Sequence, residues 1–401
     1  MSEPTNNLSS AQKRMRTERI LGVIAILTLV AAWIIGALRA RDDLMPAIRE
    51  AVPQADHIEE IGDDLFRAWG DAAETDLIGY VALGEANGYG GPLMLVAAVS
   101  PEGEILGAAV VSDKETPSWM DRVMDDEFIQ SLIGKTYSDS FSLDDDVDGV
   151  TGATYTSWAI AQAVLESSRE VARFVDLPLS EQAKPKIVFG VPEIVLLGLF
   201  IVGYVGHKPK FKYTKQVRWI SMLTGMVVLG FIYNNPLTIA NINKFLMGYW
   251  PQWQTNLYWY ILIAGILFVF TVDNKNPYCE WFCPFGAAQE CMGVIGGAKV
   301  RSPGKYRFFL QWLLRGLAWM AIFIALLLRN PGVTSYEIFG TLFELLGTGV
   351  QLALLALVLL TSLFIRRPWC TYLCPLHPVY EFIRMVRKWI LGLWPKRNQH
   401  V

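Results

Sequence analysis

The chain has 401 residues, of which 52% are hydrophobic and only 18% are charged, and its mean hydropathy is +0.30. This composition is too apolar for an ordinary water-soluble protein and too rich in charge for a chain buried entirely in lipid. The formal net charge of -3 conceals an acidic stretch between Asp42 and Glu181 in an otherwise basic chain, without a basic patch for nucleic acid. These features predict a membrane protein that carries one water-soluble domain.

The first apolar run covers residues 20–38 and is long enough to cross a bilayer. Basic residues cluster before it and also follow it at Arg39 and Arg41, a bias that predicts a cytoplasmic N-terminus. A cleaved signal peptide is the competing interpretation, but no small-residue cleavage site follows the run. We therefore interpret residues 1–39 as a cytoplasmic N-terminus and a membrane anchor.

Residues 40–186 contain no spanning segment and are numerous enough to bury a core of their own. The apolar runs 93–99 and 105–111, separated by a turn-forming Ser-Pro-Glu-Gly-Glu stretch, predict a β-hairpin. Apolar residues at helical spacing predict a helix over residues 157–174. This part of the chain is expected to be an α+β domain.

Just before that helix lies an Asp-Gly-Val-Thr-Gly-Ala-Thr stretch at residues 148–154. Gly149 and Gly152 give permissive backbone, and small neighbours leave the hydroxyl of Thr154 open to a bulky phosphate ester. A polar turn that caps the helix is the alternative, since Thr and Ser are ordinary N-cap residues.

This stretch resembles the flavin-attachment motif of the FMN-binding domains in RnfG, NqrC and NosR-type proteins. The Gly-Tyr-Gly-Gly-Pro run at residues 88–92 and the Glu-Thr-Pro run at residues 115–117 are similar to further motifs of that family, in the same order. Two departures are Lys114, at a position often occupied by His, and Ser118-Trp119, which replaces the usual Gly. The resemblance implies FMN esterified to Thr154 by a flavin transferase. It also implies a flavin site formed by Asp148, Thr151, Gly152, Ala153, Glu115, Thr116, Gly90 and Gly91.

Five more apolar runs follow, at residues 187–206, 217–234, 256–272, 308–328 and 349–365. The loops 207–218 and 273–307 and the segment after residue 365 are rich in Lys and Arg, whereas the opposite loops hold only Lys244 and Arg329. The positive-inside rule then predicts six transmembrane helices, both termini in the cytoplasm, and the α+β domain in the periplasm of a Gram-negative inner membrane. Residues 187–377 are the expected five-helix membrane domain.

The cysteines form an internal repeat. Cys279 and Cys283 in Pro-Tyr-Cys-Glu-Trp-Phe-Cys-Pro match Cys370 and Cys374 in Pro-Trp-Cys-Thr-Tyr-Leu-Cys-Pro, and each copy follows the second span of a helix hairpin. Four thiolates brought together in this way suit an iron-sulfur cluster or Zn²⁺, and uncoordinated thiols are the remaining alternative. Cys291 lies outside the repeat and is expected to be a buried apolar residue.

The paired Cys-x-x-x-Cys-Pro motifs also resemble those of NosR and NapH-type membrane proteins. The resemblance implies an iron-sulfur centre, of the 2Fe-2S or 4Fe-4S type, at the cytoplasmic side. NosR-like proteins continue into a ferredoxin domain where this sequence ends with a basic, amphipathic stretch at residues 378–401, so a separate cytoplasmic protein is expected to exchange electrons with the centre. The few His residues include no pair within the spans to hold haem, and the intramembrane Glu193 and Arg315 are candidates for a functional role.

The sequence therefore predicts a membrane electron-transfer flavoprotein that works with membrane or periplasmic redox subunits, or with a quinone. Two alternatives remain open: a NosR-like redox regulator or maturation factor for a periplasmic metalloenzyme, and an accessory subunit of a larger complex with a structural metal. The expected carrier is a part of a redox chain rather than a stand-alone catalyst.

Overall fold

Alternating and continuous apolar runs between residues 57 and 112 form a five-stranded antiparallel sheet in the order β1-β2-β3-β4-β5. The computed structural model describes residues 10–39, 43–115, 117–143, 145–180, 186–208, 212–300, 304–334, 336–344 and 348–393. The strands are β1 His57–Gly62, β2 Leu65–Trp69, β3 Leu77–Asn87, β4 Pro92–Val99 and β5 Ile105–Ser112. The predicted hairpin is confirmed as β4 and β5, which pair antiparallel with Ala97 opposite Ala108.

Helices cover both faces of this sheet. The predicted helix is α4, Thr154–Phe174, which packs on β3 and β4 and encloses the larger apolar core of the domain. Close approach is possible because Gly84 has no side chain: a Cβ there would lie 1.9 Å from the carbonyl oxygen of Ala163. The short helix α2, Met45–Ala51, packs on the other face against β4 and β5. Two further short helices precede the Thr154 motif, α3 at Pro117–Asp125 and η1 at Gln130–Leu132.

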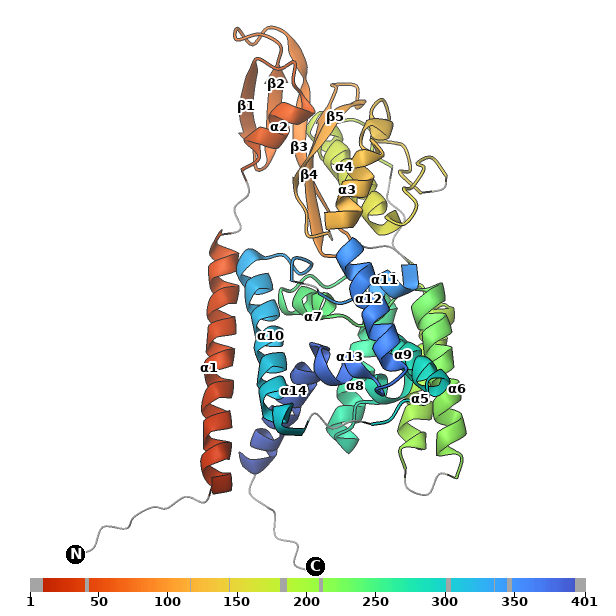
Figure 1. The fold of residues 1–401 in the computed structure, drawn as a ribbon. Coiled ribbons are helices and arrows are strands. Elements are labelled where there is room, and N and C mark those ends of the chain that lie inside the picture. Colours follow the sequence, from red (N-terminus) through yellow and green to blue (C-terminus); the bar gives the residue numbers. More distant parts are fainter. Residues whose placement is uncertain are drawn as a thin grey trace, which may run out of the picture.

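The remainder of the chain is a helical bundle at one end of which the sheet domain sits (Figure 1). Its elements are α1 Ser10–Arg39, α5 Val191–Gly206, α6 Thr214–Thr224, α7 Ile239–Leu246, α8 Leu257–Asp273, α9 Pro284–Ile295, α10 Arg307–Leu328, α11 Phe339–Glu344, α12 Gly349–Ser362, α13 Pro368–Tyr372 and α14 Leu376–Leu393. The π-helical segments η2, Gly225–Ile232, and η3, Tyr278–Phe282, and the 3-10 turn η4, Gly304–Tyr306, complete the described elements.

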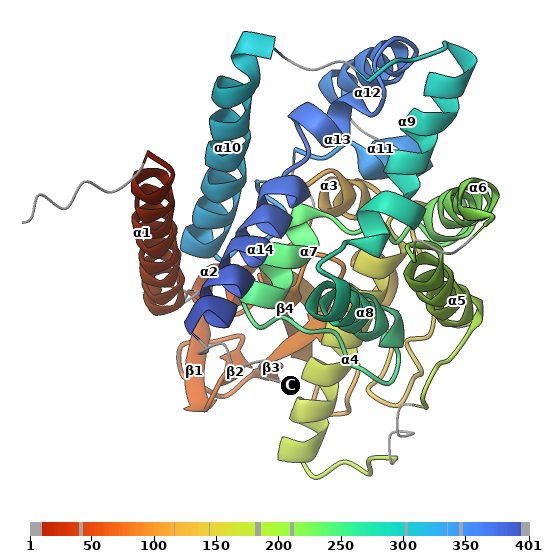
Figure 2. The same cartoon turned by 90° about the horizontal axis from the view of Figure 1, so that it is seen from below.

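The long helix α1 lies at the edge of the bundle beside α10 (Figures 1 and 2). Within the described residues, only the stretches Arg16–Arg39 and Gly304–Leu328 are both long and apolar enough to cross a membrane. Val191–Gly206, Leu257–Asp273 and Gly349–Ser362 are apolar but shorter, and the predicted span at residues 217–234 is divided between α6 and η2. The six-helix membrane topology therefore stays a prediction.

Two loops at the sheet end of the bundle reach down to the Cys motifs. The backbone N–H of Leu237 donates to the hydroxyl of Tyr278, the residue before Cys279, at 2.8 Å. The hydroxyl of Tyr336 donates to the carbonyl of Leu373, the residue before Cys374, at 3.2 Å. The motifs thus contact loops that enter from the opposite end of the bundle.

Candidate functional site: a flavin loop and a four-cysteine cavity

The hydroxyl of Thr154 is presented at the start of a helix. Thr154 is the first residue of α4 and is exposed, whereas Thr156, two residues later, is buried. The turn before the helix is held by Ser157, whose hydroxyl accepts from the N–H of Val150 at 3.1 Å and donates to the carbonyl of Ala153 at 3.1 Å. Gly152 has a φ of +81°, which a residue with a side chain adopts only with strain. A reactive hydroxyl on a fixed, open turn is the geometry that a phosphate ester requires.

Glu115 ties this helix to the glycine loop at residues 88–92. Its side chain is 1% exposed and accepts from the N–H of Gly90 at 2.9 Å and from the hydroxyl of Thr156 at 2.8 Å. Burial raises the pKa of the Glu115 carboxyl above its usual range. Glu115 therefore orients the predicted flavin loop from behind rather than presenting a carboxylate to a ligand. The neighbouring Thr116 lies outside the described residues.

Aromatic rings surround the exposed Thr154. Tyr89 meets Trp119 edge to face with ring centroids 4.7 Å apart, and lies 6.3 Å from the ring of Tyr155. The guanidinium of Arg122 donates to the carbonyl of Thr151 at 3.1 Å. Rings beside an attachment point suit an isoalloxazine, which packs on aromatic faces. Of the other predicted flavin residues, Asp148 is exposed on the turn, while Gly90 and Gly91 lie in the loop that Glu115 holds.

The bundle reaches this loop through one buried cation. The ammonium of Lys244, on α7, donates to the carbonyls of Gly88 at 3.0 Å and Tyr89 at 2.7 Å. Burial lowers the pKa of Lys244 to about 8, while the charge of Glu115 acts in the opposite direction. Tyr249 also lies next to Gly91. The flavin loop is therefore docked directly on the helical bundle.

The two Cys pairs meet around one cavity. Cys279 lies in η3 and Cys283 at the start of α9, while Cys370 lies in α13 and Cys374 directly after it. All four line a cavity of about 580 Å³, which Cys291 does not line. Within the described part of the chain, no three His, Cys, Asp or Glu side chains lie close enough together to hold one metal ion. Four thiols spaced around a larger cavity suit a multi-iron cluster better than Zn²⁺, whose thiolate bonds are about 2.3 Å long.

Amide side chains direct N–H groups at two of these sulfurs. Asn276 donates to Sγ of Cys279 at 3.2 Å, and Gln289 donates to Sγ of Cys370 at 3.3 Å. The carbonyl oxygen of the Gln289 side chain also accepts from the N–H of Trp369 at 2.9 Å. Gln289 therefore joins the first half of the repeat to the second, and N–H donors of this kind tune an iron-sulfur centre.

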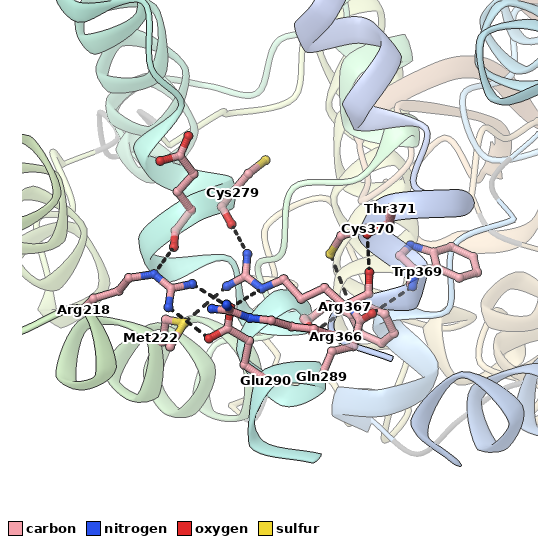
Figure 3. Close-up of polar contacts among 12 residues, drawn as sticks. Arg218, Met222, Cys279, Gln289, Glu290, Arg366, Arg367, Trp369, Cys370 and Thr371 are labelled. Carbon is pink, nitrogen blue, oxygen red and sulfur yellow. Dashed lines mark hydrogen bonds and ion pairs between the residues drawn. The ribbon is translucent and has the colours of Figure 1, made fainter. Parts of the chain in front are cut away.

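A cluster of arginines flanks the cavity (Figure 3). Glu290 forms ion pairs with Arg218 at 2.7 Å, Arg366 at 3.0 Å and Arg367 at 2.8 Å, and its own side chain is only 4% exposed. Arg367 also donates to the carbonyl of Cys279 at 2.8 Å and lines the cavity. We name Glu290 and these three arginines the arginine cluster.

The other half of the repeat has a corresponding ion pair. Glu290 stands seven residues after Cys283, and Glu381 stands seven residues after Cys374. Glu381 pairs with Arg315 on α10 at 3.1 Å, so the predicted intramembrane Arg315 has a carboxylate partner. The internal repeat thus extends beyond the Cys and Pro positions to an acidic residue, a signal that the spacing of 91 residues contains.

Two known protein families match this chain at the two sites. The family described as FMN-binding domain matches residues 88–167. The family described as 4Fe-4S binding domain matches residues 255–303 and 348–396, one match for each half of the Cys repeat.

Three relatives join these features. One component of the ion-translocating oxidoreductase complex of Stutzerimonas stutzeri is 30% identical over 166 residues, which cover 36% of this chain and 72% of that protein. The protein NirI of Paracoccus denitrificans is 27% identical over 237 residues, 53% of this chain and 34% of NirI. The regulatory protein NosR of Pseudomonas aeruginosa is 24% identical over 201 residues, 46% of this chain and 27% of NosR.

The chain belongs to the NosR- and NirI-like flavoproteins. Its FMN-binding domain is of the RnfG and NqrC type. The chain spans about a third of the length of NirI and about a quarter of NosR. The matching domains support FMN and an iron-sulfur cluster as the cofactors of this flavoprotein, and an electron-transfer role.

Proposed function

We propose that this flavoprotein carries electrons through a membrane between a 4Fe-4S cluster and an FMN that is bound covalently to Thr154. The cluster ligands are Cys279, Cys283, Cys370 and Cys374. The observation that carries the proposal is that four buried thiols line one cavity in the same chain in which an exposed Thr154 starts the helix of the FMN-binding domain.

The contacts between the two sites favour transfer within one chain. Lys244 docks the flavin loop on α7, directly after the segment in which Leu237 contacts Tyr278. Tyr336 similarly links a loop near the sheet domain to Leu373. A cysteine site placed at the far surface would lie beyond a hydrocarbon core about 30 Å thick. These contacts instead support a site within the bundle, at a shorter distance from the flavin.

The proposed orientation has six spans, both termini in the cytoplasm and the FMN-binding domain in the periplasm. It is supported by the basic loops and by the arrangement in Figure 1, in which the first turns of α1 and the end of α14 lie opposite the sheet domain. Cytoplasmic and periplasmic partners of the redox chain follow from this orientation.

The chain's own residues position and isolate these cofactors. FMN and an iron-sulfur cluster would supply the electron-carrying chemistry when bound. Asn276 and Gln289 orient N–H groups at the sulfurs, and the buried walls around the Cys cavity exclude water. Glu115 and Lys244 hold the flavin loop against the bundle, so that the loop keeps a constant distance from the Cys site.

Iron and sulfide analysis of the purified full-length protein tests the cysteine assignment. We expect about four iron and four sulfide per chain and an EPR signal after reduction with dithionite, lost in Cys279→Ala and Cys374→Ala but retained in Cys291→Ala. Zn²⁺ without iron or acid-labile sulfide would exclude the proposed electron carrier.

A regulatory role is the second candidate, because one relative is named a regulatory protein. The two functions differ in turnover. A carrier passes electrons from its reduced cysteine site to its flavin within a catalytic cycle, as stopped-flow absorbance would measure, whereas a regulator needs no transfer at that rate.

A further inference from the structure

The arginine cluster has an unbalanced charge next to the Cys cavity. Among the ion pairs of the described residues, Glu290 is the one carboxylate partner of Arg218, Arg366 and Arg367. Three guanidinium groups and one carboxylate leave a net charge of two positive units. Because two of these arginines are largely buried, with side-chain exposures of 22% and 16%, water screens this charge only in part.

The positive charge is directed at the thiols. Arg367 lines the same cavity as the four Cys residues and donates to the carbonyl of Cys279. It sits immediately before the proline of the second motif, where the first motif has the neutral Asn276. The corresponding pair in the other half of the repeat, Glu381 with Arg315, is balanced. The two halves therefore share a carboxylate position but differ in charge, and the excess lies on one side of the cavity.

Packing alone does not account for this arrangement. A buried ion pair is a weak source of stability, because desolvation offsets most of its attraction, and surplus buried cations add further cost. The surplus becomes favourable when an anion occupies the cavity, as a cluster held by four thiolates would. Each added electron makes such a site more negative, so the nearby cations stabilise the reduced form more than the oxidised form.

We propose that the arginine cluster raises the reduction potential of the cysteine site, with Arg367 as the main contributor and Glu290 as a brake that limits the effect. This inference rests on the proposed function, since it requires a redox centre at the four Cys residues. Arg367 and Glu290 are positioning residues in this account, because they act on the centre through charge and without bonding to it.

The test is an EPR-monitored redox titration of the full-length protein, with dithionite as reductant and ferricyanide as oxidant. We expect Arg367→Gln to lower the midpoint potential and Glu290→Gln to raise it. Arg367→Lys keeps the charge and is expected to stay closer to wild type than Arg367→Gln. The matched control is Arg67→Gln in the sheet domain, where Arg67 pairs with Glu59 far along the chain from the Cys motifs, and no shift is expected.

Opposite shifts are a result that mere loosening of the fold does not give, since loosening would move both variants in one direction. If Arg367→Gln loses its iron, Arg366→Gln is the substitute, because Arg366 also pairs with Glu290 but is about half exposed and is expected to give a smaller downward shift. Shifts of equal sign, or no shift in variants with full iron content, would overturn the inference while leaving the carrier function standing. Absence of iron from the wild type would instead overturn both.

Discussion

Replacement of Lys244 by Met tests how the flavin loop is docked. The side chain of Lys244 is buried and makes two hydrogen bonds, to the carbonyls of Gly88 and Tyr89. Hydrogen bonds from a charged donor contribute about 1.5–3 kcal/mol each, and relief of the cost of burying the ammonium offsets part of this. A net loss of about 3 kcal/mol is expected, which corresponds to roughly a hundredfold increase in the opening equilibrium of the loop.

Hydrogen exchange followed by mass spectrometry measures that opening. Peptides covering residues 88–92 and α7 should lose protection by about two orders of magnitude in Lys244→Met. Lys212→Met is the control, since Lys212 is exposed at a different loop and makes a cation–π contact with Tyr213. Wild-type protection of residues 88–92 in Lys244→Met would refute the assignment of this contact as the docking bond.

The same lysine makes docking depend on pH. Its pKa is about 8 when docked and returns toward 10.5 when the loop opens, so the open state binds more protons between those values. Docking is therefore weaker below about pH 8 and strengthens as pH rises toward about 10.5. Exchange rates corrected for their intrinsic pH dependence should show this trend in the wild type and lose it in Lys244→Met.

Two further substitutions test the sites themselves. Gly90→Ala would place a Cβ 1.8 Å from the carbonyl oxygen of Lys114, so we expect the flavin loop to be displaced and flavin content to fall severalfold, as absorbance of the purified protein would measure. Unchanged flavin content would contradict the close approach. Gln289→Leu leaves the buried N–H of Trp369 unpaired at a cost of about 1–3 kcal/mol and removes the donor to Cys370, so thermal stability and iron per chain should both fall. Wild-type values of both would remove Gln289 from the cysteine site.

The parts of this fold that follow from local pattern were predictable from the sequence. Continuous apolar runs identified β4 and β5, and helical spacing identified α4, although the helix begins at Thr154 rather than near residue 157. The spacing of Cys and Pro identified the repeat whose two halves line one cavity. The strands β1 to β3 were not predicted, because their burial is mixed and their pairing depends on neighbours.

Contacts between distant segments were beyond reach of sequence pattern. Lys244 reads as an isolated loop charge, yet its ammonium bonds to residues that lie 155 and 156 positions away. Gln289 and Arg367 likewise gain their roles from the second half of the repeat meeting the first. Glu115 was expected at the cofactor, but Gly90 and Thr156 occupy its carboxylate, a pairing that only the folded domain reveals.

Intact mass spectrometry of the denatured chain tests the central claim most directly. After coexpression with a flavin transferase, the wild type should gain the mass of FMN less one water and keep its yellow fluorescence. Thr154→Ala should lose both, while Thr156→Ala, which removes only the buried bond to Glu115, should keep both. An unmodified wild-type mass, or a modification that survives in Thr154→Ala, would contradict the account.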